Sequence, residues 1–354
     1  MPFTRQHSNQ VKPRRLDRGW SQAELAQRAA ISRAAVSAIE VNRLVPSVAA
    51  AMSLALALKC TVEALFGDEE SDGKTDPVWA WPSPQNPCRY WHATLGTRTL
   101  LYPVESTPAG EIEHDGMCQD GILRTRSRVS ADQTLVLASC DPAAGLLASE
   151  IHRLSGLRVI VLPRSSQQAI SLLGDGLVHA AGIHLATPQS SDSNRQVVRE
   201  RLGSGYSLLR VARWQDGLAL SPAAAAGSIR EALAAKLHWV GRQAGSGARQ
   251  CQDELLEDRR PPRHTAHDHR GVAEAIRSGW ADAGVCLRLV SDETGLRFFS
   301  VREEIYELCF ATESESDPRI RALKQTLRAG SYQKLLAELP GYSAAECGEL
   351  EQII

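Results

Sequence analysis

Residues 22–41 read QAELAQRAAISRAAVSAIEV, and their apolar spacing changes phase in the middle. Leu25 and Ala29 mark one helical face, whereas Val36 and Ile39 mark a second face at a three-residue step. Two short helices that meet at an angle require such a change of phase, and a single amphipathic helix does not. The stretch therefore predicts a helix-turn-helix, with an ordinary helical hairpin as the alternative.

Two small residues set the expected geometry of this pair of helices. Ser32 can cap the second helix, because its hydroxyl can accept a hydrogen bond from a free backbone amide. Ala26 has a small side chain, which lets the second helix cross closely. The side chains left on the outer face are Gln22, Arg33, Ala34, Ser37 and Ala38.

Residues 14–67 resemble the DNA-binding domain of the XRE family of Cro and phage repressors, through SQAELAQRAA, SRAAVSAIE and NRLVPS. The second helix of that family lies in the major groove of DNA. The resemblance implies DNA-binding roles, with Arg43 on a phosphate, for Gln22, Ser32, Arg33, Ala34, Ser37 and Arg43. Ala30 stands where the family usually has glycine, and a left-handed alanine costs roughly 1 kcal/mol or more.

The charge of the chain is unevenly distributed. The 354 residues carry a formal net charge of −1 and are 43% hydrophobic, as expected for a globular protein of two or three domains. Residues 1–67 contain nine Lys or Arg against four acidic residues. This excess lies where DNA phosphates would attract it, although a basic solvated face is the simpler explanation of the charge alone.

No stretch approaches eighteen consecutive apolar residues, and the N-terminal sequence lacks the apolar core of a signal peptide. We therefore expect a cytoplasmic protein without a membrane partner. The eight cysteines contain no CxxC pair, which argues against a zinc site and a disulfide framework. His264, His267 and His269 lack further ligands at suitable spacing, so no metal site is expected.

The rest of the sequence divides into three segments. Residues 68–77 include an acidic, polar run and predict a linker after the helix-turn-helix domain of residues 1–67. Residues 78–132 are rich in proline and tryptophan, and predict either a small β-rich subdomain or an extended segment. Residues 133–350 alternate strand and helix patterns, which predicts an α/β domain with mainly parallel sheets. Among its strands we expect LRFFSV and EIYELCFA as two separate ones.

Several expected junctions between a strand and a helix carry hydroxyl groups and glycine. The carboxyl ends of parallel strands share one crevice, into which helix N-termini direct their amides, and this favours an anion. RQAGSGAR at 242–249 predicts an oxyanion cradle, with Ser246 adding a hydroxyl and Arg242 and Arg249 adding charge. It lacks the GK[ST] of a nucleotide P-loop. The alternatives are that Ser139 and Ser165 only cap helices and that GSG is a flexible turn.

The order of these motifs resembles the type II periplasmic-binding-protein fold, in particular the PBP-like domain of some cytoplasmic regulators. The similarity rests on LASCDPAAGLL, LVHAAGIHL, WVGRQAGSGAR, GWADAG and EEIYELCF. It implies two α/β lobes, joined by crossing strands, that close on a ligand such as molybdate or tungstate. The residues to which it gives ligand-binding roles are Ser139, Ser165 or Ser166, His184, Ser246, Gly247, Arg249, His269, Asp282, Glu304 and Tyr306, and the cradle pattern adds Arg242 and Gly245. Cys286 stands where molybdate carriers often have tyrosine.

The expected function is a one-component transcriptional regulator that binds an operator in double-stranded DNA as a homodimer and senses a small anion, first of all molybdate or tungstate. Arginine in the site also suits carboxylates and phosphates. No GxSxG, HExxH or dinucleotide motif has a suitable setting, so neither an enzyme nor a cofactor is expected. Two alternatives remain. One is a regulator of another small metabolite, including a molybdenum-cofactor precursor, and the other is a cytosolic molybdenum-cofactor-related protein whose basic head binds protein.

Overall fold

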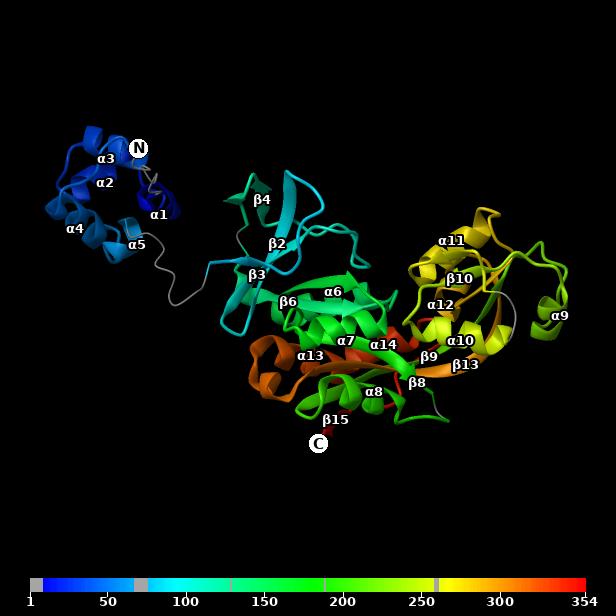
Figure 1. The fold of residues 1–354 in the computed structure, drawn as a ribbon. Helices are drawn as coiled ribbons and strands as arrows, with labels where there is room; N and C mark the ends of the chain where they lie inside the picture. The colour runs from blue at the N-terminus through cyan, green and yellow to red at the C-terminus, as the bar shows by residue number, and fades with distance from the viewer. Residues whose placement is uncertain (1–8, 67–75, 128, 188, 258–260) are drawn as a thin grey trace. The chain divides into compact units, whose positions relative to one another are not determined.

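The computed structural model describes residues 9–66, 76–127, 129–187, 189–257 and 261–354. The chain forms two compact units, residues 1–75 and 76–354, each with its own hydrophobic core (Figure 1). Most of the predicted linker at 68–77 lies outside the described residues. Among the described helices, none combines the length and the apolar character that crossing a bilayer requires.

The first unit is the predicted helix-turn-helix bundle. Its helices are α1 (Val11–Asp17), α2 (Gln22–Arg28), α3 (Arg33–Glu40), α4 (Val48–Ala57) and α5 (Glu63–Phe66). Ser32 Oγ accepts a hydrogen bond from the Ala35 amide at 3.0 Å, so the predicted cap of α3 is present. Both predicted apolar faces lie in one core together with Leu54 of α4 and Leu58, which follows α4. The residues of the two faces are Leu25, Ala26, Ala29, Val36 and Ile39.

A buried ion pair joins α1 to α3. Arg15 donates from Nε to Glu40 Oε1 at 2.6 Å and from Nη2 to Glu40 Oε2 at 3.0 Å. Gln22 Nε2 donates to the same carboxylate at 2.9 Å. Burial by itself would raise the pKa of Glu40, but the bonds from Arg15 and Gln22 lower it below its usual value. The network therefore fixes the start of α2 relative to α3.

Residues 78–132, for which the sequence left two possibilities open, contain a five-stranded sheet in the order β1-β3-β2-β4-β5. Its strands are β1 (Val78–Trp79), β2 (Cys88–Leu95), β3 (Arg98–Pro103), β4 (Gly116–Gln119) and β5 (Ile122–Thr125). Arg158 of the following domain donates to both carboxylate oxygens of Asp115 at 2.7 Å, and Asp115 is fully buried. Tyr102 Oη also donates to the Leu177 carbonyl at 2.8 Å. These bonds attach the small sheet to the α/β domain.

The α/β domain is built on a long mixed sheet in the order β12-β9-β13-β8-β6-β7. The strands are β6 (Thr134–Ser139), β7 (Arg158–Pro163), β8 (Ala180–Ala186), β9 (Tyr206–Leu220), β12 (Ala283–Leu287) and β13 (Arg297–Ala311), and β14 (Tyr342–Ser343) and β15 (Leu350–Ile353) also pair with β9. In this sheet β6 pairs parallel with its two neighbours, β7 and β8. The pairs β8–β13, β13–β9 and β9–β12 are antiparallel. The expectation of mainly parallel sheets was therefore wrong.

LRFFSV and EIYELCFA, expected as two strands, are one strand, β13. The register of β13 against β9 shifts at two places, between Ser300 and Arg302 and between Tyr306 and Glu307. Such shifts let one strand continue although its alternation of apolar and polar residues is interrupted. Strands β9 and β13 are fifteen residues long each and pair from end to end, and they run through both lobes of the domain. They are the crossing strands that the resemblance implied.

The first lobe contains β6, β7 and β8 with helices α6 (Ala144–Ser155), α7 (Ser166–Gly174), α8 (Ser193–Leu202), α13 (Pro318–Arg328) and α14 (Gly330–Ala337). The second contains β10 (Val240–Arg242), β11 (His264–Ala266) and β12 with helices α9 (Ile229–Ala234), α10 (Gly247–Leu256), α11 (His269–Arg277) and α12 (Arg288–Glu293). All six residues of β6 are buried, as a strand covered on both faces requires. Figure 1 shows helices on both faces of the sheet in the first lobe.

The turn between α2 and α3 yields a prediction about stability. Ala30 has φ 52°, the left-handed conformation inferred for this position. We expect Ala30→Gly to slow amide hydrogen exchange across residues 22–41, with a gain of about 1 kcal/mol in the opening free energy. Ala29→Gly, at a buried position with φ −88°, should speed exchange. Equal effects of the two substitutions would contradict the assignment of strain to Ala30.

Candidate functional site

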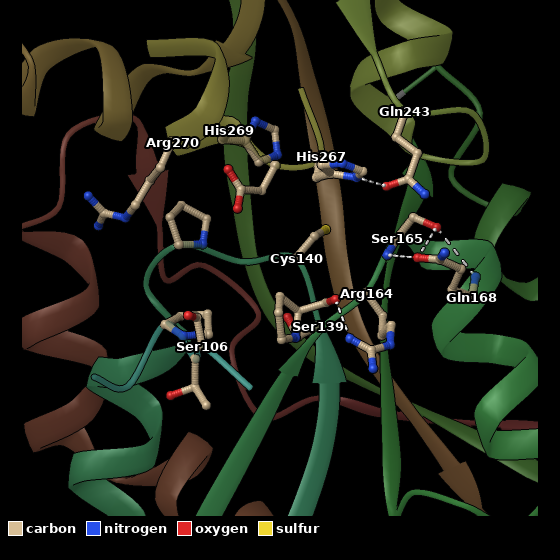
Figure 2. Close-up of a pocket in the computed structure, with 15 residues that line it drawn as sticks. Ser106, Ser139, Cys140, Arg164, Ser165, Gln168, Gln243, His267, His269 and Arg270 are labelled. Carbon is tan, nitrogen blue, oxygen red and sulfur yellow. Dashed lines mark hydrogen bonds between the residues drawn. The ribbon is translucent and has the colours of Figure 1, made fainter. Parts of the chain in front are cut away.

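A cavity of about 560 Å³ lies between the two lobes of the α/β domain, within the size range of small-molecule sites. The first lobe contributes Ser139, Cys140, Pro142, Pro163, Arg164, Ser165 and Gln168. The second lobe contributes Gln243, His267, Asp268, His269 and Arg270. Ser106, Thr107 and Pro108, from the loop between β3 and β4, complete the wall. Figure 2 shows the side chains of the two lobes facing each other, with the Cys140 sulfur between them.

A chain of hydrogen bonds leads from Cys140 into the protein. Cys140 Sγ lies 3.0 Å from His184 Nε2, and His184 Nδ1 lies 2.8 Å from Glu304 Oε2. The Trp214 indole donates to the same carboxylate oxygen at 3.0 Å. Burial would lower the pKa of His184, but Cys140 and Glu304 raise it well above its usual value. His184 is therefore held protonated and donates from both ring nitrogens.

Arg302 links the crossing strand to the start of α10. Its Nη2 donates to Glu304 Oε1 at 2.6 Å and to the Gly247 carbonyl at 2.8 Å. Gly247 has no room for a side chain, because an added Cβ would lie 2.3 Å from the His184 carbonyl oxygen. The close packing of α10 against His184 therefore requires glycine at position 247.

Arg242 is the most unusual side chain of the site. It is fully buried, and none of its three guanidinium nitrogens has a hydrogen-bond partner. Burial lowers its pKa, while nearby Cys140 and Asp216 act in the opposite direction. A guanidinium stays protonated in proteins, so Arg242 is a buried cation with unused donors. Native structures rarely leave such groups unpaired without a functional reason.

A second unused donor belongs to His269. Its Nδ1 accepts a hydrogen bond from the Leu287 amide at 3.2 Å, so the neutral ring carries its hydrogen on Nε2. Nε2 has no partner. Burial, together with Arg242 and His184, lowers the pKa of His269 well below its usual value and keeps the ring neutral. His269 lines the cavity and the buried Arg242 lies close enough for its charge to act on His269 and Cys140, so two unused donors of the kind that anions accept lie at this wall of the cavity.

Cys140, His184 and His269 each place a possible metal ligand atom within 4.8 Å of the others. Among the described residues, they are the cluster of His, Cys, Asp or Glu side chains whose geometry could hold a metal ion. Their hydrogen bonds do not suit a cation, because both His184 nitrogens donate and His269 Nε2 carries a hydrogen. The neighbouring Arg242 charge would also repel a metal ion. The donor set favours an anion.

The structure brings together only some of the residues predicted to bind the ligand. Ser139, Ser165 and His269 line the cavity. Fully or almost fully buried are Ser166, His184, Arg242, Glu304 and Tyr306. Ser165 also caps α7, whereas Ser139 Oγ is bonded to Tyr306 Oη at 2.6 Å.

The predicted cradle of 242–249 is distributed differently. Gly245, Ser246 and Arg249 line a separate hollow with residues of α8, and Arg249 donates to Asp253 at 2.8 Å. Ser246 Oγ is used in capping α10 and in a bond to the Gln243 carbonyl at 3.0 Å. Of the two arginines, Arg242 is buried, whereas Arg249 lies partly exposed on α10. The expectation that both arginines serve one cradle therefore needs correction.

Asp282 lies away from the cavity. Its carboxylate accepts from the His238 amide at 2.8 Å, so it fixes a turn before β12. Residues of the site that were not predicted from the sequence include Arg164, Gln168 and Arg270 in the cavity wall and Cys140, Trp214, Asp216 and Arg302 around His184 and Glu304. Asp216 offered a signal, because it is the one acidic residue between Tyr206 and Leu220. Residues 106–108, which also line the cavity, carry no pattern in the sequence that predicts a place in the site.

The outer face of α3 carries the predicted DNA contacts. Ser32, Arg33, Ala34 and Arg43 are exposed, and Ser37 is half-buried. Gln22 is also half-buried and already donates to Glu40. The first turn of α3 is the part that reads base edges in a helix-turn-helix, so Arg33 is the best placed of these side chains.

Comparison with known families agrees with both units. The PBP superfamily domain matches residues 148–328, just over half of the chain, and a helix-turn-helix family matches residues 11–65. The chain belongs to the PBP superfamily. It joins this domain to an XRE-type helix-turn-helix, and so combines DNA binding with a domain for a small ligand. No match was found among curated proteins.

Solved structures with a similar fold are distant in sequence. A phosphate transport receptor from Vibrio cholerae has 13% identity and a TM-score of 0.42, over 59% of this chain and 99% of its own. A putative phosphate-transporter binding protein from Clostridium perfringens has 10% identity and a TM-score of 0.47, over 59% and 99%. The tungstate ABC transporter from Geobacter sulfurreducens has 14% identity and a TM-score of 0.46, over 59% and 100%.

The exposed position of Arg33 yields the second prediction. Arg33→Ala should lower affinity for DNA from upstream of the protein's own gene by about tenfold or more, because a bidentate contact with a base is worth about 1–3 kcal/mol. Fluorescence anisotropy at a fixed salt concentration measures the change. Arg28→Ala removes the same charge from α2, where the guanidinium lies 4.2 Å from the Trp20 ring centre, and should cost less than about threefold. Unchanged binding by Arg33→Ala would exclude its role in the groove.

Proposed function

We propose that this PBP-superfamily protein is a one-component transcriptional regulator that senses a small anion. It acts in the cytoplasm as a homodimer, in which two helix-turn-helix domains read two half-sites of an operator. The observation that carries the proposal is Arg242, a buried guanidinium without a hydrogen-bond partner, beside the unused Nε2 hydrogen of His269. An anion that accepts from both groups removes the cost of burying them unpaired.

The first candidates for this anion are molybdate and tungstate, on the resemblance of the domain to oxyanion-binding relatives. Carboxylates and phosphates form a second class, which two observations favour. The planar guanidinium of Arg242 suits bidentate acceptors, and a cavity of about 560 Å³ has room for an organic anion, including a molybdenum-cofactor precursor. We propose a binding function without catalysis.

Ligand binding can change DNA affinity because the proposed site takes groups from both lobes. Ser139 and His184 belong to the first lobe, whereas Arg242 and His269 belong to the second. The lobes also touch directly, since the Gln167 amide donates to the Gly245 carbonyl at 3.3 Å. An anion bound by both lobes stabilises the closed domain, and a coupling of about 1–3 kcal/mol to the DNA-binding domains would suffice for regulation.

The third prediction tests the anion. Calorimetry of the full-length protein with molybdate, tungstate, phosphate, sulfate and succinate should find at least one ligand. Arg242→Met should weaken its binding by about 100-fold, because a charge-assisted hydrogen bond contributes about 1.5–3 kcal/mol and Arg242 can donate more than one. Arg249→Ala, seven residues away in the other hollow, should change affinity less than about threefold.

The melting temperature of Arg242→Met without ligand provides the control for folding. It should equal or exceed that of the wild-type protein, since the substitution removes an unpaired buried cation. Absence of binding by the whole panel, or equal losses in Arg242→Met and Arg249→Ala, would overturn the anion site. A protein that binds the anion but no DNA would instead support the cytosolic molybdenum-cofactor-related alternative.

The fourth prediction concerns pH. Burial first, and then the negative charge of Glu304, raise the pKa of Asp216 to about 7, while Arg302, His184 and Arg242 act against this rise. Asp216 is neutral below this value and charged above it, and its negative charge repels a bound anion. Affinity for molybdate, whose own charge is constant here, should therefore fall severalfold from pH 6 to pH 8. Asp216→Asn should remove the pH dependence and bind at pH 8 as tightly as the wild-type protein does at pH 6.

A further inference from the structure

Cys140, His184 and Glu304 have an arrangement that anion binding does not require. A thiol, an imidazole and a carboxylate stand in one chain of hydrogen bonds of 3.0 Å and 2.8 Å. In this order the carboxylate orients the ring, and the ring takes the proton of the nucleophile. The three residues come from different elements, since Cys140 follows β6, His184 lies on β8 and Glu304 lies on β13.

The surroundings hold His184 in this orientation. Its ring contacts Trp214 edge to face at 5.1 Å between centroids, and Trp214 also donates to Glu304. On another side, a Cβ on Gly247 would lie 2.6 Å from His184 Nδ1, which shows how closely α10 packs against the ring. His184 therefore cannot turn away from Cys140 without moving one of these neighbours.

Cys140 is also the cysteine that a molecule bound in the cavity would meet. It lines the cavity, and none of the other seven cysteines, all within the described residues, does so. His269, whose Nε2 hydrogen is unused, lines the same cavity, and the charge of the buried Arg242 acts on both Cys140 and His269. Arg242 and His269 are at most 1% exposed, and a His269 ring nitrogen lies within 4.8 Å of the Cys140 sulfur. Donors placed beside a nucleophile can stabilise an oxygen on which negative charge develops.

We propose that Cys140 is a nucleophilic cysteine and a site of oxidation by small hydroperoxides. In the pair with His184 the proton of the Cys140 thiol already lies on His184 Nε2, which donates it back to the sulfur in a hydrogen bond of 3.0 Å, and the sulfur attacks one oxygen of ROOH. A sulfur–oxygen bond forms as the oxygen–oxygen bond breaks, and the departing RO⁻ takes the proton from His184 to leave as ROH. The sulfur is oxidised by two electrons to sulfenic acid, and the peroxide is reduced. Arg242 and His269 donate to the departing oxygen.

The inference does not depend on which anion the protein binds, so its test stands apart from calorimetry. Reduced full-length protein is treated with hydrogen peroxide in the presence of dimedone, which labels sulfenic acids, and each cysteine is followed by quantitative mass spectrometry. Cys60, which is half-buried in the helix-turn-helix unit, serves as an internal reference. Cys140 should be labelled at least tenfold faster than Cys60, although it is only 9% exposed. A rate at or below that of Cys60 would overturn the proposal.

Three variants separate activation of the thiol from simple access. Glu304→Gln should slow labelling of Cys140 at least tenfold and leave that of Cys60 unchanged, and Glu304→Asp should restore part of the rate. Glu307→Gln is the matched control, because Glu307 is a buried carboxylate of the same strand that pairs with Arg210 and Asn194. It should label at the wild-type rate. Equal rates in Glu304→Gln and the wild-type protein would show that Glu304 does not activate Cys140, and would also overturn the proposal.

Discussion

The antiparallel pairing of β9 with β13 is the feature on which the ligand-binding domain depends. Each strand is fifteen residues long, which is enough to enter the sheets of both lobes. Their side chains supply the buried polar groups at the junction, with Trp214 and Asp216 on β9 and Arg302 and Glu304 on β13. Because adjacent strands stay in register through backbone hydrogen bonds, these four groups keep fixed distances from one another. The start of α10 packs against them, since Arg302 donates to the Gly247 carbonyl.

Burying so many polar groups costs stability unless each finds a partner. Glu304 accepts from His184, Trp214 and Arg302, and this compensation lowers its pKa despite burial. Arg242, His269 and one oxygen of Asp216 remain without partners in the same region. A protein selected for stability alone would replace them with apolar residues. Their presence is explained if something that binds there completes the hydrogen bonds.

How accurately the sequence predicted each helix, strand or site residue depended on the pattern from which it was predicted. Periodic apolar patterns located α2, α3, β6 and α6 within a few residues, because such patterns follow from local geometry. The two halves of β13 were separated wrongly, since the polar residues in its middle resemble a loop, although two of them, Arg302 and Glu304, are bonded to each other at the buried junction. Arg242 and Arg249 flank the same GSG segment, yet one ends a strand and turns inward, whereas the other lies on a helix surface. Spacing alone could not distinguish them.

By itself, the sequence determined that a helix-turn-helix precedes an α/β domain of the PBP superfamily, including the left-handed turn at Ala30. These features depend on residues close together in the chain. Tertiary structure alone decided which polar residues share one site. Cys140, His184, Arg242, His269 and Glu304 come from five different segments, and only the pairing of strands across both lobes brings them together. Their hydrogen bonds and burial, which set their charges, exist only after that assembly.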